Sequence, residues 1–319
     1  MTDMVSINKL GDRPLARQGP PRHGPLAMTH ILTLIAARDA TTLTHPTITR
    51  VRDALGGGQV TILSPDEAAD IACATAPDLA QVRAALENAA IDTIVIPAED
   101  RRKRLLIADM DSTIITGETL DELAAFAGLG QEIAAITARA MNGELDFKNA
   151  LRERVGMLKN LSVTALDRTW DCIRLTPGAL ELVATMRAHG AFTALVSGGF
   201  TFFTSRVKEW VGFDLHRSNE LLTDGSVLLG QVAEPILDRS AKLTMLRNLT
   251  ARRGLPLSAA LAVGDGANDL DMIMAAGLGV AFHAKPIVAA AAGARVDHGD
   301  LRALLFAQGY PVSAFVTAG

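Results

Sequence analysis

Three compact apolar runs, at residues 105–109, 192–199 and 261–266, each end in carboxylates or small polar residues. Stretches of helical periodicity lie between the runs, and continuous apolar strands that alternate with helices are typical of a parallel sheet covered on both faces. Ligands bind outside the carboxyl ends of such strands, so residues at the three ends should share one site. The residues at these ends are Asp109, Asp111, Ser197, Gly198, Gly199, Asp265, Asn268 and Asp269.

The acidic residues at these ends predict a site for a divalent cation. Asp109 and Asp111 stand two residues apart, so both side chains point to one side of an extended chain. Bringing carboxylates together costs free energy through repulsion and desolvation, which a bound cation offsets. A third carboxylate, from Asp265 or Asp269, would complete the hard oxygen site that Mg²⁺ prefers, with water and a substrate phosphate in the remaining positions.

The neighbouring hydroxyl, glycine and lysine residues add the features of an anion site. Ser197 supplies a hydroxyl, and the glycines after it let backbone N–H groups approach an anion closely. Lys242 lies near the start of a predicted helix at 240–252, where its charge and the helix dipole would both favour a phosphate. Each feature alone is common, but their order along predicted strand ends indicates a phosphoryl-transfer site.

In this order the motifs resemble those of the haloacid dehalogenase-like (HAD) superfamily. The run Asp109-Met110-Asp111-Ser112-Thr113 matches its DxDxT motif, Ser197 and Lys242 match the second and third motifs, and residues 264–269 match GDxxxD. The resemblance implies that Asp109 is a nucleophile that forms an aspartyl-phosphate, and that Asp111 is the general acid and base. It also implies that Asp109, Asp111 and Asp265 bind Mg²⁺, and that Asp269 lies behind these ligands and supports them. With these acidic motifs, dehalogenation is the weaker alternative.

Two longer segments, 109–124 and 141–155, resemble the phosphoserine phosphatases of this superfamily. The resemblance implies hydrolysis of O-phospho-L-serine to serine and phosphate, the last step of serine biosynthesis. It implies that Glu118 receives the substrate ammonium and that Arg154 binds the substrate carboxylate. The remaining substrate contacts that it implies are Met141, Phe147, Ser197, Gly198, Lys242 and Asn268.

The spacing of the second segment gives independent support for Arg154. Phe147 and Arg154 are seven residues apart, which places both on one face of a helix that is otherwise apolar on that face. A guanidinium on such a face needs an anion if it is buried. The alternative is that Arg154 reaches solvent or pairs with an acidic residue of the chain, such as Glu122 or Glu153.

The 319 residues suggest about two domains, and the chain changes character along its length. Residues 1–27 hold four prolines and no apolar period, which predicts a disordered tail. Residues 28–100 follow the β-α-β-β-α-β order of a ferredoxin-like α+β fold and resemble ACT-type domains, which bind amino acids or mediate dimer contacts. Residues 101–319 predict an α/β unit with a Rossmann-like HAD core and a parallel sheet.

Two interruptions of the α/β pattern predict additions to that core. Residues from about 118 to 176 are helical by period and too long for a crossover loop, which predicts a helical cap inserted over the sheet edge. Asp224-Gly225 lies between apolar segments within 214–236, which predicts a small β-hairpin flap.

The composition argues against several other classes of protein. The net charge of −4 and the aromatic content of 4% disfavour nucleic-acid partners, and no apolar stretch reaches the roughly 18 residues that a transmembrane helix needs. The two isolated cysteines, Cys73 and Cys172, fit a reducing compartment, so we expect a cytoplasmic protein without a membrane partner. We further expect a homodimer, with serine as a candidate feedback ligand of residues 28–100.

Two other functions share parts of this pattern. A phosphotransferase that passes phosphate from Asp109 to an alcohol such as homoserine would need the same carboxylates. An amino-acid sensor would use residues 28–100 and carry a decayed phosphatase site. The intact set of Asp109, Asp111, Ser197, Lys242 and Asp265 argues against such decay.

Overall fold

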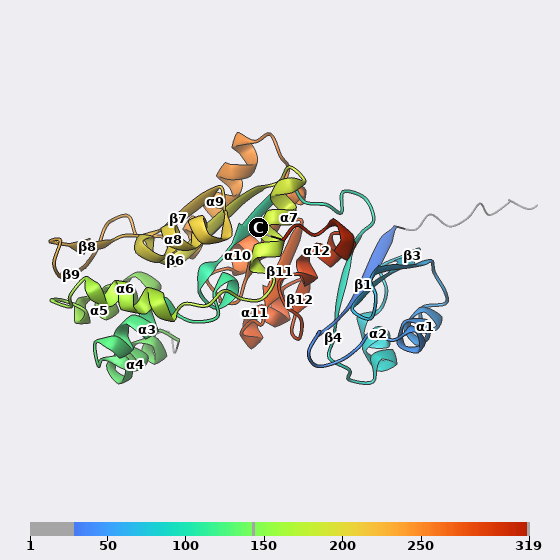
Figure 1. Cartoon of the computed structure of the whole chain (residues 1–319), viewed down its shortest axis with the longest axis horizontal. Coiled ribbons are helices and arrows are strands. Elements are labelled where there is room, and N and C mark those ends of the chain that lie inside the picture. Colours follow the sequence, from blue (N-terminus) through green and yellow to red (C-terminus); the bar gives the residue numbers. More distant parts are fainter. Residues whose placement is uncertain (1–28, 142–143, 318–319) are drawn as a thin grey trace, which may run out of the picture.

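The computed structural model describes residues 29–141 and 144–317, and the predicted tail at 1–27 lies outside this range. Figure 1 shows an N-terminal module beside a larger unit, with a group of helices at the far end of the molecule from the module. The module contains a four-stranded sheet, and the larger unit contains a six-stranded sheet and a two-stranded hairpin. The predicted α/β class is therefore confirmed.

The N-terminal module has the predicted order of elements. They are β1 (His30–Ala36), α1 (His45–Ala54), β2 (Val60–Ser64), β3 (Ala68–Cys73), α2 (Leu79–Leu86) and β4 (Ile91–Pro97). Neighbouring strands are antiparallel, in the order β2-β3-β1-β4. Alternate residues of β1 point to opposite faces, so Leu32 and Leu34 pack with the two helices while Ile35 joins the core of the larger unit. The second face of the module's sheet is thus buried against the larger unit.

The larger unit is built on six parallel strands in the order β12-β11-β10-β5-β6-β7. Their bounds are β5 (Leu105–Ala108), β6 (Phe192–Phe200), β7 (Leu215–Asn219), β10 (Ala260–Gly264), β11 (Leu278–Phe282) and β12 (Ala294–Val296). Leu106 and Leu105 of β5 belong to separate apolar clusters on opposite faces. Both faces are therefore covered, which is why the central strands are continuously apolar.

The covering helices of the larger unit follow its strands along the chain. They are α7 (Ala179–Ala188), α8 (Thr201–Val211), α9 (Arg239–Arg252), α10 (Leu270–Ala275), α11 (Pro286–Ala291) and α12 (Ala303–Ala307), with single helical turns at Leu257–Ala259 and Val312–Ala314. Residues Met110–Ile114, after β5, form a wide turn in which Asp111 and Ser112 have non-helical backbone angles. Within residues 29–141 and 144–317, no helix is long and apolar enough to cross a membrane.

Four helices of the described chain form the cap, namely α3 (Thr119–Phe126), α4 (Gly130–Met141), α5 (Phe147–Met157) and α6 (Thr164–Cys172). The chain enters and leaves this cap through two paired segments. Ile115 forms an antiparallel bridge with Leu175, and the N–H of Thr116 donates to the carbonyl of Arg174 with 3.0 Å between N and O. The helices lie within the cap predicted at about 118–176, whose boundaries remain a prediction.

The predicted flap at 214–236 is wrong in its first part. β7 pairs in parallel with β6 at the edge of the large sheet, so residues 215–219 belong to the core. The hairpin consists only of β8 (Leu221–Thr223) and β9 (Leu228–Val232), and Asp224 accepts backbone N–H bonds in the turn between them. The sequence of β7 is largely polar because an edge strand is partly exposed, and it therefore lacks the apolar run that identified the central strands.

Gly178 and Gly190 have the same left-handed backbone, with φ of +83° and +82°, but different surroundings. A Cβ at Gly178 would lie 2.7 Å from the backbone nitrogen of Arg302, whereas nothing lies within 4 Å of one at Gly190. We expect Gly190→Ala to lower the free energy of unfolding by about 1–2 kcal/mol through backbone strain alone. Gly178→Ala should cost about 1–3 kcal/mol more, because overpacking adds to the strain. Chemical denaturation measures both variants, and equal losses would contradict this packing.

Candidate active site

The carboxyl ends of β5, β6 and β10 lie side by side, as predicted, because β5 is the neighbour of both other strands. Asp109 follows β5, and its backbone N–H donates to the carbonyl of Val263 in β10, with 3.0 Å between N and O. The Asp109 side chain is buried, and its Oδ1 accepts the N–H of Met110 at 2.8 Å. The chain around the strand end therefore fixes this carboxylate and leaves Oδ2 for another partner.

Lys242 reaches that second oxygen from α9. Asp238 caps the helix by accepting the N–H of Ala241, which fixes the first turn in which Lys242 lies. The Lys242 Nζ lies 2.8 Å from Oδ2 of Asp109 and 2.6 Å from Oδ1 of Asp269. Burial alone would lower the pKa of Lys242, but the two carboxylates outweigh it and raise that pKa, so the lysine keeps its charge.

Three carboxylates, those of Asp109, Asp265 and Asp269, have oxygens that all lie within 4.8 Å of one another. Burial, followed by the charge of Asp109, raises the pKa of Asp265 to about 6, and burial also raises the pKa of Asp269. A single lysine does not neutralise three carboxylates, and carboxylate oxygens are the donors that hard divalent cations prefer. The donor set therefore fits a divalent cation, and Asp269, predicted to lie behind the ligands, belongs to the same group.

The Asp111 carboxylate has other partners. Its Oδ1 accepts the N–H of Thr119 at 2.8 Å, and its Oδ2 accepts the hydroxyl of Ser197 at 3.2 Å. Burial, reinforced by the negative charges of Glu118 and Asp109, raises the pKa of Asp111 to about 7. A carboxyl group with this pKa exchanges its proton near neutral pH, which suits a general acid and base. The metal contact predicted for Asp111 remains a prediction.

The loop after β6 approaches both the carboxylates and the cap. A Cβ at Gly199 would lie 2.8 Å from Oδ2 of Asp111, and one at Gly198 would lie 3.2 Å from the ring of Phe147 in α5. Asn219, at the end of β7, holds this loop because its Nδ2 donates to the carbonyl of Gly198 at 2.8 Å. Asn219 was not predicted as a site residue, although the rule of strand carboxyl ends identifies it once β7 is assigned to the sheet.

Glu118 and Arg154 place one anion and one cation on the cap side of the site. Glu118 accepts the hydroxyl of Ser112 at 2.7 Å, and burial raises the pKa of Glu118. Arg154 forms no ion pair within the part of the chain that the structure describes, and burial lowers its pKa against the opposing charges of Asp121 and Glu118. Glu153, one alternative partner of Arg154, pairs with an arginine of α4 instead. The geometry leaves Arg154 suited to an anionic ligand.

Two further predicted substrate contacts are placed only in part. The side chain of Asn268 lies over Gly266, too close to admit a Cβ there. Met141 is the last residue of α4, and its side chain lies outside the described part of the structure. Contacts of these residues with a substrate remain predictions, as do those of Phe147, Ser197 and Gly198.

Comparison with known proteins agrees with this arrangement of motifs. Residues 106–274 match the family model of the haloacid dehalogenase-like hydrolases, so the chain belongs to that family. Its curated relatives include a phosphoserine phosphatase of Archaeoglobus fulgidus, which is 44% identical over 217 residues. That alignment covers 66% of this chain and 63% of the relative. The chain spans between about half and two thirds of the length of several curated relatives that it matches.

Solved structures give the same family resemblance. The unliganded crystal structure of a probable phosphoserine phosphatase from Vibrio cholerae has a TM-score of 0.73 and 32% identity, and the match covers 90% of this chain and 88% of that one. A substrate-bound phosphoserine phosphatase complex has a TM-score of 0.61 and 38% identity, with coverage of 64% and 98%. About two thirds of this chain is thus similar to nearly the whole of that second protein.

Replacing Lys242 by methionine would leave Asp109 and Asp269 buried without their cation. We expect K242M to lose about 3–5 kcal/mol of unfolding free energy at pH 8 in the presence of EDTA. The loss should shrink toward pH 5. Burial already raises the pKa of Asp269 above its value in the unfolded chain, so the folded state gains protons first as the pH falls and is stabilised relative to the unfolded state. Thermal unfolding of both proteins at the two pH values tests this, and a loss independent of pH would contradict the charge pairing.

Proposed function

We propose that the protein is a Mg²⁺-dependent phosphatase that hydrolyses O-phospho-L-serine to L-serine and phosphate, the final step of serine biosynthesis. The observation that carries the proposal is a buried carboxylate, Asp109, paired with Lys242 beside a second carboxyl group, Asp111, whose pKa is about 7. Hydrolysis through an aspartyl-phosphate needs a nucleophile and an acid–base group placed in this way. The relatives named phosphoserine phosphatase support the choice of substrate.

In the first step, a carboxylate oxygen of Asp109 attacks phosphorus, and the bond between phosphorus and the serine oxygen breaks. Asp111 donates its proton to that oxygen, so serine leaves as a neutral alcohol rather than as an alkoxide. In the second step, Asp111 takes a proton from a water molecule whose oxygen attacks the aspartyl-phosphate. The bond between phosphorus and Asp109 then breaks, and phosphate is released.

The charges around phosphorus are balanced by residues of the core. The Lys242 ammonium, 2.8 Å from the Asp109 carboxylate, would also attract the phosphate oxygens. Asp109, Asp111 and Asp265 would hold Mg²⁺, which when bound supplies positive charge against the same oxygens, and Asp269 would support this group. Ser197, Gly198 and Asn268 would bind the phosphate through a hydroxyl, a backbone N–H and an amide.

The cap supplies partners for the other two charged groups of phosphoserine. Glu118 would bind the ammonium and Arg154 the carboxylate, while Met141 and Phe147 cover the substrate. The paired segments around Ile115 and Leu175 form the connection on which the cap can move. Closure of the cap would exclude bulk water and hold the ester in line with Asp109.

The location, oligomeric state and regulation of the enzyme are proposed from the same resemblance. We propose a cytoplasmic homodimer in which residues 28–100 form an ACT-like module with serine as a candidate feedback ligand. The β2-β3-β1-β4 order of the antiparallel sheet supports the ACT-like assignment, since it is the strand order of a ferredoxin-like fold. Light scattering of the full chain and calorimetric titration with serine test these two properties.

Asp109→Asn removes the nucleophile and keeps the size of the side chain. We expect kcat for phosphoserine to fall by about a thousandfold or more, because loss of a nucleophile is that costly in other covalent mechanisms. Phosphate release measures the rate, and intact mass spectrometry of a quenched reaction should show a phosphorylated protein only for the wild type. Unchanged turnover in the variant would exclude the covalent mechanism. Phosphohomoserine formed when homoserine is added would favour the phosphotransferase.

Arg154→Ala removes the proposed carboxylate contact. We expect KM for phosphoserine to rise by about 30-fold or more, because truncation of one partner of a buried charge pair costs 2 kcal/mol or more. KM for phosphoethanolamine, which lacks the carboxylate, should change little. Arg152→Ala is the matched control, since Arg152 lies on the same helix and pairs with Glu234 at 2.6 Å. Equal effects of Arg154→Ala on both substrates would refute the assigned role.

A further inference from the structure

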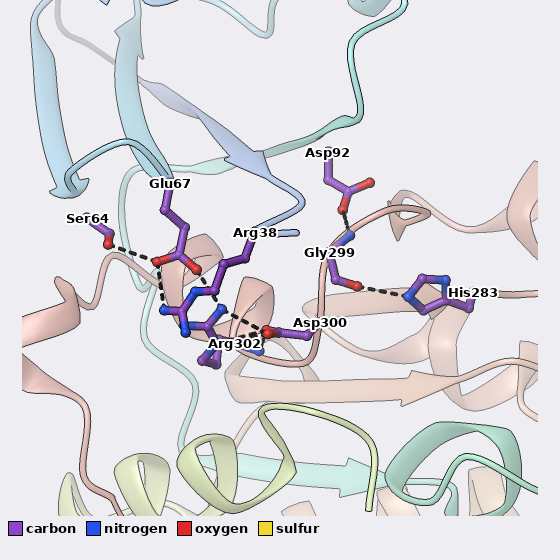
Figure 2. A network of polar contacts seen from close by, with 8 residues as sticks. All are labelled: Arg38, Ser64, Glu67, Asp92, His283, Gly299, Asp300 and Arg302. Carbon is purple, nitrogen blue, oxygen red and sulfur yellow. Dashed lines mark hydrogen bonds and ion pairs between the residues drawn. The ribbon is translucent and has the colours of Figure 1, made fainter. Parts of the chain in front are cut away.

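The N-terminal module inserts one buried carboxylate into the larger unit. Asp92 lies on β4, on the same face as Ile94 and Ile96, and is only 4% exposed. Its Oδ1 accepts the N–H of Asp297 at 2.8 Å, and its Oδ2 accepts the N–H of Gly299 at 2.7 Å, as Figure 2 shows for Gly299. The backbone nitrogen of His298, which lies between Asp297 and Gly299 in the chain, is 3.2 Å from Oδ1 of Asp92 and 3.3 Å from Oδ2. One carboxylate of the module therefore holds three successive backbone donors after β12.

The segment that Asp92 holds in turn supports His283, which follows β11. The ring Nε2–H of His283 donates to the carbonyl of Gly299 at 2.8 Å (Figure 2). The backbone N–H of His283 donates to the carbonyl of Val296, also at 2.8 Å. His283 has φ of +42°, a left-handed conformation that costs free energy for a residue other than glycine. Such a conformation persists only where its surroundings fix it, and residues 296–299 provide that support.

From His283 the chain leads directly to the carboxylate cluster. Two residues later, the N–H of Lys285 donates to the backbone carbonyl of Asp265 with 3.1 Å between N and O. The position of the Asp265 loop therefore depends on the segment that begins at His283.

The contact between the module and the larger unit is itself built from buried charges. Glu67 of the module lies 2.6 Å from Arg302, and both side chains are at most 9% exposed. Figure 2 shows Arg38 and Ser64 beside the same glutamate and Asp300 beside Arg302. Buried ion pairs hold only in one geometry, because a displaced partner leaves an uncompensated charge. The module thus meets residues 297–302 in a fixed position.

We propose that Asp92 is a positioning residue for the metal site, through which the N-terminal module holds residues 297–299, and thereby His283 and the loop that carries Asp265. The proposal rests on the proposed function only in that the carboxylate cluster binds Mg²⁺. The N-terminal module, although it resembles a separate regulatory domain, is then a structural part of the catalytic unit.

The test is Mg²⁺ binding to the full chain, measured by isothermal titration calorimetry without substrate. Asp92→Asn keeps the shape of the side chain but turns one acceptor oxygen into an N–H₂ donor that faces backbone N–H groups. We expect Mg²⁺ to bind about 2- to 30-fold more weakly to this variant, the range of coupling found for mutations between distant sites. Unchanged Mg²⁺ affinity would overturn the proposal.

Asp70→Asn is the matched control for loss of stability. Asp70 lies on β3, is 6% exposed and faces the larger unit, but it pairs with Arg101 and does not touch residues 297–299. We expect both variants to lower the thermal midpoint, and only Asp92→Asn to weaken Mg²⁺ binding. Equal weakening in both variants would show a general loosening of the interface and would overturn the positioning role.

A second variant tests the proposed route. His283→Gly accepts the left-handed backbone but lacks the ring hydrogen bond, so it should weaken Mg²⁺ binding as Asp92→Asn does. The double variant should bind little more weakly than either single variant, because both changes release the same loop. Fully additive losses of Mg²⁺ affinity in the double variant would overturn the proposed connection from Asp92 through His283 to the Asp265 loop. Phosphoserine turnover of the wild type is measured separately, so a wild type that binds Mg²⁺ without hydrolysing the ester refutes the proposed function alone.

Discussion

Three buried carboxylates around one buried lysine form the constraint on which the rest of the site depends. The carboxylates of Asp109, Asp265 and Asp269 have oxygens within 4.8 Å of one another, so their negative charges repel, and burial raises the pKa of Asp265 and of Asp269. The backbone offsets part of this cost, because N–H groups donate to Asp109 and Asp269. Lys242 offsets another part, and its position depends on α9 and on the Asp238 cap. In the proposed function, the charge that remains would give the site its affinity for a cation and for a phosphate that binds with it.

Predictions from the sequence succeeded where one strand or one motif decides the outcome. The central strands are apolar along their whole length because both faces are covered, so their ends, and with them Asp109, Ser197 and Asp265, could be located. Lys242 could be placed because it lies in the first turn of a helix that the sequence predicts. The role of Glu118 came from family resemblance alone. Helical spacing added support for Arg154, because it places the guanidinium on an apolar face, but it does not show which ligand the guanidinium binds.

Predictions failed where a residue's role depends on which element lies beside it. The strand at 215–219 is largely polar because it lies at the edge of the sheet. Without that strand in the predicted sheet, Asn219 could not be assigned to the site. Asp92 falls within an alternating strand pattern, in which a carboxylate normally marks the solvent face. Only the contact between the two sheets shows that this face is buried, and a contact of that kind leaves no periodic signal in the sequence.

The paired segments that join the cap to the core bear on how this enzyme family can diversify. The N–H groups of Thr116 and Thr176 donate to the carbonyls of Arg174 and Ile114 on either side of the Ile115–Leu175 bridge. The two ends of the cap are thus held together, and the core meets the cap at two adjacent segments. The length and content of the inserted helices therefore add little to the chain entropy that the core must overcome to fold. A lineage could exchange one cap for another, and so change the substrate, while the carboxylate cluster of the core stays as it is.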